Sequence, residues 1–192
     1  MRSKLAHELH NKTTFGFWLY LMTDCLVFAS LFATYGVLRN NTAGGPNGNE
    51  LFDLWFVLVE TLLLLVSSLT AGLALLYVRA GMRRDALTWM VITFISGAGF
   101  LALELYEFVA LIGEGHSWQT SGFLTSYFTL VGTHGLHIAV GLLWLGVLIV
   151  RAYQTRLTPK VVQQFTLFSL FWHFLDIIWI LIFSLVYLMG VL

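Results

Sequence analysis

Long apolar runs alternate with short polar segments along the chain, and each run can cross a lipid bilayer as a helix. Crossing a hydrocarbon core of about 30 Å takes roughly 20 apolar residues. The pattern therefore predicts an all-α fold, an integral membrane helical bundle with five transmembrane helices in a single domain. The predicted spans cover about residues 15–38, 51–78, 87–112, 122–150 and 165–189. Because the connections between spans are short, we expect sequential helices to pack as antiparallel neighbours.

Composition agrees with this pattern and excludes several classes of protein. The chain is 58% hydrophobic and only 10% charged, with a net charge of zero. A neutral chain lacks the basic surface that nucleic acids require, so no nucleic-acid partner is expected. The single cysteine, Cys25, lies inside the first span. One thiol can form neither a disulfide framework nor a CxxC metal site.

The distribution of positive charge predicts the orientation in the membrane. Cytoplasmic segments of membrane proteins carry an excess of Lys and Arg. Arg39 alone falls on one side of the predicted membrane. The cations on the opposite side are Arg2, Lys4, Lys12, Arg79, Arg83, Arg84, Arg151, Arg156 and Lys160. We therefore expect residues 1–14 to form a short cytoplasmic segment, with the C-terminus outside.

Eight ionisable residues lie inside the apolar runs, and they are the candidate functional residues. A charged side chain at the centre of a bilayer costs about 2.5–3.5 kcal/mol on insertion scales. These side chains should therefore face one another or a partner rather than lipid. They are Asp24, Glu60, Glu104, Glu107, His134, His137, His173 and Asp176.

The spacing of these residues places several of them on common helix faces. Glu104 and Glu107 are three residues apart, as are His134 and His137. Residues at this spacing share a helix face. In the last span, His173 and Asp176 are likewise three residues apart, one turn after a serine.

Several kinds of chemistry are compatible with this set. Pairing between histidines and carboxylates at helix contacts would satisfy both groups, and we favour this interpretation. A proton relay is a second possibility. Ligation of iron or zinc is a third, although the Glu-x-x-His spacing of di-iron bundles is missing. A haem held between His134 and His173 is a fourth. We therefore predict an intramembrane polar network and assign no catalytic, cofactor-binding or metal-binding residue in this chain.

Four stretches of the sequence resemble the subunit III family of haem–copper oxidases. GFLTSYFTLVGTHGLHIAVGLLWL is similar to the family helix that carries HGLH. FSLFWHFLDIIWILIFSLVYLMG is similar to its final helix, with the pattern WHF-x-D-x-x-W. ALELYEF and VETLLLLVSS resemble two further conserved helices, and the likeness runs in order from Phe15 to Gly190.

Within the family, the chain is most similar to the branch found in cytochrome bo-type ubiquinol oxidases. FGFWLYLMTDCLVFASLFATY, NNTAGGPNG and FVLVETLLLL carry this likeness. The five-span layout also fits that branch, because longer family members have two additional N-terminal helices. One position departs from the broader family, which usually has a glutamate where this chain has Asp24.

The resemblance implies an accessory subunit that carries no redox centre of its own. In such a complex, haem b, haem o or a, copper and ubiquinol belong to other subunits. The complex oxidises ubiquinol, reduces O2 to water and pumps protons across the bacterial inner membrane. Subunit III packs against subunit I, holds phospholipid, and sustains proton uptake and stability.

The sequence is also compatible with three other functions. An accessory subunit of a nitric oxide reductase belongs to the same family. A membrane metalloenzyme that uses the histidine and carboxylate set belongs to a different class. A proton-coupled transporter or channel is the third alternative.

Overall fold

The computed structural model describes the backbone of residues 2–42, 53–155 and 157–191, and side chains from Lys12 to residue 190 within those ranges. Two sequence predictions fall partly outside them, because the start of the second span at residue 51 and the cation Arg156 are not among the described residues. The five long helices are α1 (Arg2–Leu38), α3 (Leu54–Arg79), α4 (Arg83–Gly113), α5 (Gly122–Gln154) and α6 (Pro159–Ile182), and the last continues into η1 (Phe183–Leu188) and α7 (Met189–Val191). Five helical segments in the described chain are long and apolar enough to span a membrane, which confirms the predicted fold class.

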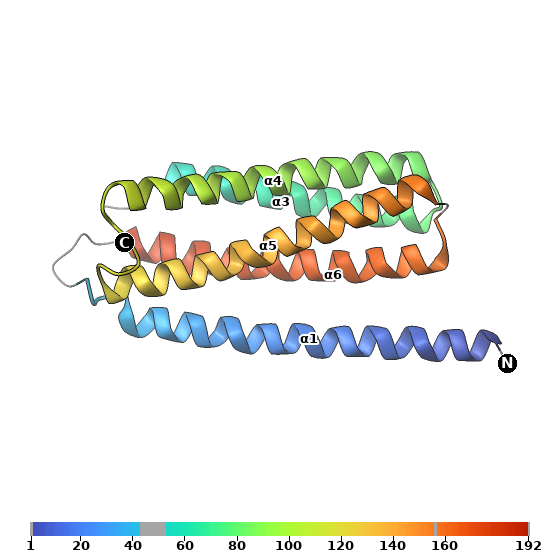
Figure 1. Ribbon diagram of the computed structural model, residues 1–192, viewed down its shortest axis with the longest axis horizontal. Helices are drawn as coiled ribbons and strands as arrows, with labels where there is room; N and C mark the ends of the chain where they lie inside the picture. Colours follow the sequence, from blue (N-terminus) through green and yellow to red (C-terminus); the bar gives the residue numbers. More distant parts are fainter. Residues whose placement is uncertain (1, 43–52, 156, 192) are drawn as a thin grey trace.

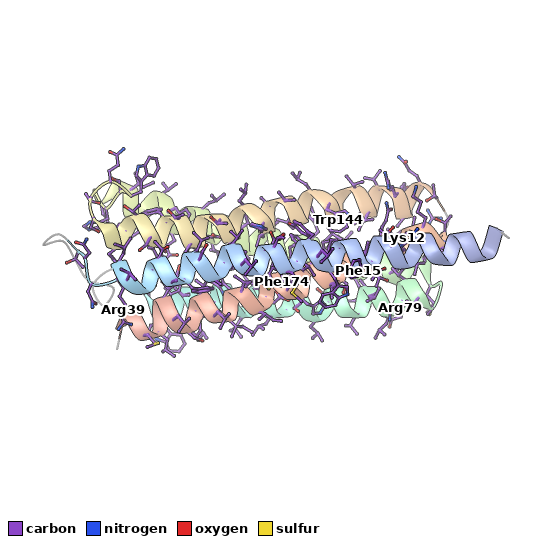
Figure 2. The ribbon with its side chains drawn as sticks, turned by 90° about the horizontal axis from the view of Figure 1, so that it is seen from below. Lys12, Phe15, Arg39, Arg79, Trp144 and Phe174 are labelled. Atoms are coloured by element: carbon purple, nitrogen blue, oxygen red, sulfur yellow. The ribbon has the colours of Figure 1, made fainter. Side chains whose placement is uncertain are left out.

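Four of the helices, α3 to α6, form a bundle, and α1 lies along one side of it (Figure 1). Helices α3, α4, α5 and α6 pack as sequential neighbours, as their short connections predict. The first helix departs from that expectation, because α1 packs mainly on α5 and α6 rather than on α3. Figure 2 shows Arg39 at one end of the bundle, and Lys12 and Arg79 at the other. We call these the Arg39 end and the Arg79 end.

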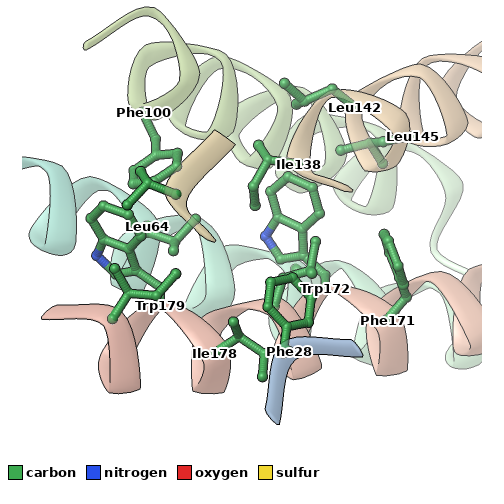
Figure 3. Packing of buried hydrophobic residues seen from close by; sticks show 14 of the residues in the cluster. Phe28, Leu64, Phe100, Ile138, Leu142, Leu145, Phe171, Trp172, Ile178 and Trp179 are labelled. Carbon is green, nitrogen blue, oxygen red and sulfur yellow. The ribbon is translucent and has the colours of Figure 1, made fainter. Parts of the chain in front are cut away.

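Helix α6 occupies the most buried position in the bundle, and its tryptophans explain how neighbouring helices approach it. The Trp172 indole lies between Gly97 of α4 and Gly141 of α5 (Figure 3 shows its surroundings). A Cβ atom at either glycine would come within 2.8 Å of the Trp172 ring. Small residues allow such close approach between membrane helices. The two glycines therefore form the space that the indole fills.

Each buried tryptophan of α6 also makes one hydrogen bond to α3. The Trp172 Nε1 donates to Ser67 Oγ at 2.9 Å, and the Trp179 Nε1 donates to Thr61 Oγ1 at 3.0 Å. All four residues are buried. An indole N–H seldom stays buried without an acceptor. These bonds therefore set the register of α6 against α3.

Side-chain caps and tight turns define the helix ends. Ser121 and Thr158 accept hydrogen bonds from the first turns of α5 and α6, respectively. Arg83 donates from Nε to the Ala152 carbonyl at 2.8 Å and from Nη2 to the Tyr153 carbonyl, which ties the start of α4 to the end of α5. The turn between α3 and α4 contains Gly81 at φ 74°, a conformation that glycine adopts without steric cost.

Candidate functional site

The candidate residues lie in three groups along the bundle. Three glutamates lie toward the Arg39 end, on α3 and α4. Asp24, His134 and His137 lie further along, where α1, α5 and α6 meet. His173 and Asp176 lie on α6, beside α3. Within the described chain, no three His, Cys, Asp or Glu side chains are grouped closely enough to hold a metal ion.

The three glutamates come together where α3 packs on α4. Glu60 interacts electrostatically with both Glu107 and Glu104. Glu60 is fully buried, and Glu104 is 1% exposed. No hydrogen-bond donor among the described residues reaches a carboxyl oxygen of Glu60 or Glu104. The sequence placed Glu104 and Glu107 on one face, and the structure adds Glu60 from the neighbouring helix.

Gly135 of α5 makes room for one of these carboxyl groups. A Cβ atom at this position would lie 2.5 Å from Glu104 Oε1 and 2.9 Å from Oε2. The carboxyl group of Glu104 is therefore seated against the backbone of α5, between His134 and Leu136. Any larger side chain at Gly135 would displace it.

Two tyrosines connect the third glutamate to α5 and η1. The Tyr187 hydroxyl donates to Glu107 Oε2 at 3.0 Å and lies 2.9 Å from the Tyr127 hydroxyl. Both tyrosines are fully buried. Glu107 also lines a pocket at the Arg39 end, together with the carboxylates Asp53 and Glu114. Glu107 is thus the member of the glutamate group with access to the surface.

His134 is packed as an aromatic ring of the core. Its imidazole is fully buried and stacks on Trp179 with ring centroids 5.3 Å apart. Phe100 and Phe28 contact it edge-on at 6.0 and 6.4 Å. Neither ring nitrogen has a hydrogen-bond partner in the described part of the chain. Despite its spacing, His134 does not pair with a carboxylate, whereas its neighbour on the same face does.

His137 pairs with Asp24, and this contact joins α5 to α1. His137 Nε2 lies 3.7 Å from Asp24 Oδ2. The opposite ring nitrogen, Nδ1, donates to the Thr133 carbonyl at 2.7 Å, which orients the ring toward α1. The Phe28 ring packs on the same imidazole with centroids 5.3 Å apart. The contact gives the Asp24 carboxyl group a polar neighbour inside the membrane.

His173 and Asp176 share a face of α6, but they do not share a hydrogen bond. His173 Nδ1 donates to the Ser169 carbonyl at 2.6 Å. Asp176 is 6% exposed, and neither of its oxygens has a hydrogen-bond partner among the residues described. His173 and Ser68 of α3 both interact with its carboxyl group. The haem candidates His134 and His173 therefore lie in unlike surroundings, one enclosed by rings and the other half-buried.

Sequence reasoning missed the tyrosine pair and the tryptophan bonds. In the sequence these residues look like ordinary apolar positions, because aromatic residues are frequent in membrane helices. They are Tyr127, Trp172, Trp179 and Tyr187. A buried Tyr or Trp usually finds a polar partner, which offers a weak signal. Tyr187 also lies in the π-helical segment η1. A π turn changes which helix face the following residues occupy. The α-helical spacing therefore does not predict the face on which Tyr187 lies.

Comparison with known proteins extends over nearly the whole chain. The family described as cytochrome c oxidase subunit III matches residues 3–191. A protein of Pseudomonas aeruginosa named cytochrome bo(3) ubiquinol oxidase subunit 3 is 54% identical over 97% of this chain and 90% of its own length. The protein of that name from Pseudomonas putida is 52% identical with the same coverage. Quinol oxidase subunit 3 of Bacillus subtilis (strain 168) is 43% identical over 91% of this chain and 86% of its own. The resemblance seen in the sequence motifs is confirmed.

Proposed function

The chain belongs to the cytochrome c oxidase subunit III family, and from that premise we propose that it is the accessory subunit III of a proton-pumping ubiquinol oxidase. The observation that carries the proposal is the identity of 52–54%, over 97% of the chain, to relatives named as ubiquinol oxidase subunits. The complex oxidises ubiquinol and reduces O2 to water. Its haem b, haem o or a, and copper reside in subunits other than this one.

The internal polar contacts favour a structural role for this chain rather than a redox role. Asp24 faces His137, Glu107 accepts a hydrogen bond from Tyr187, and His134 packs among aromatic rings. These contacts join helices to one another. Subunit I is the proposed partner, and the subunit would sustain proton uptake and the stability of the complex.

A lipid-holding role has support in the shape of the bundle surface. A groove of about 800 Å³ lies between α4 and α5 and is lined mostly by apolar side chains, including Phe94, Leu142 and Leu143. Leu143 is 74% exposed, so this surface of a membrane-spanning helix faces its surroundings. A groove of this kind accepts the acyl chain of a phospholipid.

The orientation proposed from the sequence places the Arg79 end in the cytoplasm. The helix ends on that side carry Arg79, Arg83, Arg84, Arg151 and Lys160, and Lys12 of α1 lies toward the same end, whereas Arg39 lies at the other (Figure 2). The asymmetry fits the positive-inside rule. We propose a multi-pass protein of the bacterial inner membrane, with a cytoplasmic N-terminus and a periplasmic C-terminus.

Purification of the intact complex through a tag on this chain tests the proposal. We expect mass spectrometry to identify a haem- and copper-bearing subunit I, and the optical spectrum to show its haems. The names of the relatives do not favour the nitric oxide reductase alternative, and a partner subunit of that reductase would overturn the proposal. Stoichiometric iron or copper bound to this chain alone would overturn it as well.

The metalloenzyme alternative has a separate test. Replacing His134 and His173 together with alanine should weaken assembly without removing any activity that belongs to this chain by itself. A reaction catalysed by the isolated chain and lost in the double variant would favour the metalloenzyme instead.

A further inference from the structure

A polar stripe runs along the face of α6 that lies between α1 and α3. Its members recur every three or four residues, the spacing that keeps side chains on one helix face. They are Gln163, Thr166, Ser169, His173 and Asp176. At 1.5 Å per residue the stripe is about 20 Å long. It begins near the Arg79 end and ends deep inside the membrane.

A cavity follows most of this stripe. Its volume is about 370 Å³, and α1, α3 and α6 all contribute to its walls. Arg79, the last residue of α3, lies at its outer end, and His173 lies at its inner end. A water molecule occupies about 30 Å³ in the liquid, so the cavity has room for roughly ten. Polar side chains of α6 form one wall and can bond to water, whereas Trp18, Leu75 and Leu167 contribute apolar surface.

Asp176 lies one turn beyond the inner end of the cavity. It is 94% buried, because 6% of its surface is exposed, and no well-formed hydrogen bond from a described residue reaches its carboxyl oxygens, although Ser68 of α3 lies beside them. Buried polar groups nearly always have a hydrogen-bond partner. His173, which adjoins Asp176, uses Nδ1 to donate to Ser169 and turns Nε2 toward Gly72 of α3. The inner end of the cavity, at His173, therefore lies one helix turn from a buried carboxyl group that has no well-formed hydrogen bond in the described part of the chain.

We propose that this cavity holds a file of water molecules that hydrates Asp176 from the Arg79 side of the membrane. The waters add hydrogen bonds to the contact that Ser68 makes with the carboxyl group. They also connect this carboxyl group to the aqueous phase on that side. The proposal rests on the cavity and on Asp176, and it goes beyond the accessory role of the subunit.

Cysteine accessibility in the intact complex tests the proposal. Thiol reagents act on the thiolate, which forms where the cysteine meets water. Three positions probe increasing depth from the Arg79 end: Thr166, Ser169 and Ser68. The deepest is Ser68, which lies beside Asp176 and about 16 Å along α3 from Arg79. Each is replaced by cysteine in a Cys25→Ser background, because Cys25 is the only natural thiol in the chain and is exposed. The probe is a small cationic methanethiosulfonate, applied to membrane vesicles of either orientation, and mass spectrometry locates the label on this chain.

Leu69→Cys is the matched control. Leu69 follows Ser68 directly, so the two share a depth, but Leu69 is 65% exposed on the outer surface of α3. We expect Thr166→Cys, Ser169→Cys and Ser68→Cys to react from the Arg79 side, and Ser68→Cys to react roughly tenfold faster than Leu69→Cys. Equal rates at Ser68 and Leu69 would overturn the proposal, as would labelling of Ser68→Cys from the Arg39 side alone.

A dry cavity gives a different result. An acyl chain seated between α1, α3 and α6 would leave Ser169→Cys and Ser68→Cys unreactive from both sides, and this also overturns the proposal. Serine-to-cysteine and threonine-to-cysteine changes are nearly isosteric. Retention of each variant in the purified complex shows that it has assembled.

Discussion

Helices α6 and α1 carry similar apolar sequences, yet they are held in the structure by different means. The most apolar stretch of the segment Pro159–Leu188 is 50% buried inside the bundle, whereas that of α1 is 22% buried. Trp172 and Trp179 fix α6 through hydrogen bonds to α3. Among the described contacts of α1 are the pair between Asp24 and His137, ring contacts such as Phe17 with Trp144, and a long hydrogen bond from Tyr35.

The difference shows what fixes a helix in a membrane, where apolar burial alone gives little preference for protein over lipid. Close packing against glycine and specific donor–acceptor pairs determine the position of α6. In the described part of α1, few polar contacts and some aromatic packing leave most of the helix exposed to its surroundings. Variants that remove these contacts should therefore have large effects in α6 and small ones in α1.

The largest effect is expected from filling the space beside Trp172. Gly141→Leu would place its Cβ atom 2.8 Å from the indole and its remaining atoms deeper in the core. Overpacking of this kind costs about 1–3 kcal/mol, and occasionally more. We expect a marked fall in the denaturation midpoint of the purified complex and partial loss of this subunit.

Gly36→Leu in α1 is the control for that variant. Apart from the adjacent residues and the backbone of α1 itself, no described atom lies within 4 Å of the Cβ position at Gly36. Its denaturation midpoint should stay near that of the wild-type complex. Equal losses from both changes would show that α1 and α6 are packed alike, contrary to the structure.

A double-mutant cycle on Trp172 and Ser67 should give the next largest effect. Trp172→Phe removes the indole N–H and leaves the Ser67 hydroxyl without its donor. We expect the free energy of unfolding to fall by about 1–3 kcal/mol, the usual cost of such a buried loss. The coupling between the two positions should be about 0.6 kcal/mol, the average for hydrogen bonds between membrane helices. A coupling of zero would show that this hydrogen bond does not stabilise the position of α6.

Removal of a tyrosine hydroxyl compares α1 with η1, the segment that continues α6. Tyr187→Phe breaks the bonds to Glu107 and Tyr127, at 3.0 and 2.9 Å. Tyr35→Phe in α1 breaks one long bond of 3.5 Å, to the Val186 carbonyl. We expect Tyr187→Phe to lower the free energy of unfolding by about 1 kcal/mol and Tyr35→Phe to lower it by less. A larger effect at Tyr35, measured in the same denaturation assay, would reverse the comparison.

The smallest immediate effect is expected at the contact between Asp24 of α1 and His137. Asp24→Asn replaces the carboxyl group that faces His137 but keeps the size of the side chain. We expect the initial rate of oxygen reduction to stay near normal and the working life of the enzyme to shorten. Repeated turnover measurements in an oxygen electrode check both parts. A prompt loss of turnover in an intact complex would assign Asp24 a direct part in the reaction.

Part of the candidate site could be predicted from spacing alone, because residues three or four apart share a helix face whatever the fold. In this way the sequence predicted that Glu104 and Glu107 share one face of α4. It did not predict which residue of another helix each would contact. Spacing along a helix says nothing about which face of another helix lies opposite, so Glu60 beside Glu104 and His137 beside Asp24 came from the structure. His134 and His137 also share a helix face, so their spacing did not distinguish them. Only the structure shows that His134 packs among aromatic rings and that His137 lies beside the Asp24 carboxyl group.

The sequence by itself determined that this protein is a bundle of membrane helices and, through its motifs, to which family it belongs. Both depend on local order along the chain: apolar length fixes a span, and a motif is a short string of residues. Only the tertiary structure decided that α1 packs on α5 and α6, that Gly97 and Gly141 enclose Trp172, and that a cavity leads along α6 toward Asp176. These features depend on which helices meet, at what depth and through which faces. That choice is made by side chains far apart in the sequence, so no single stretch of it contains the answer.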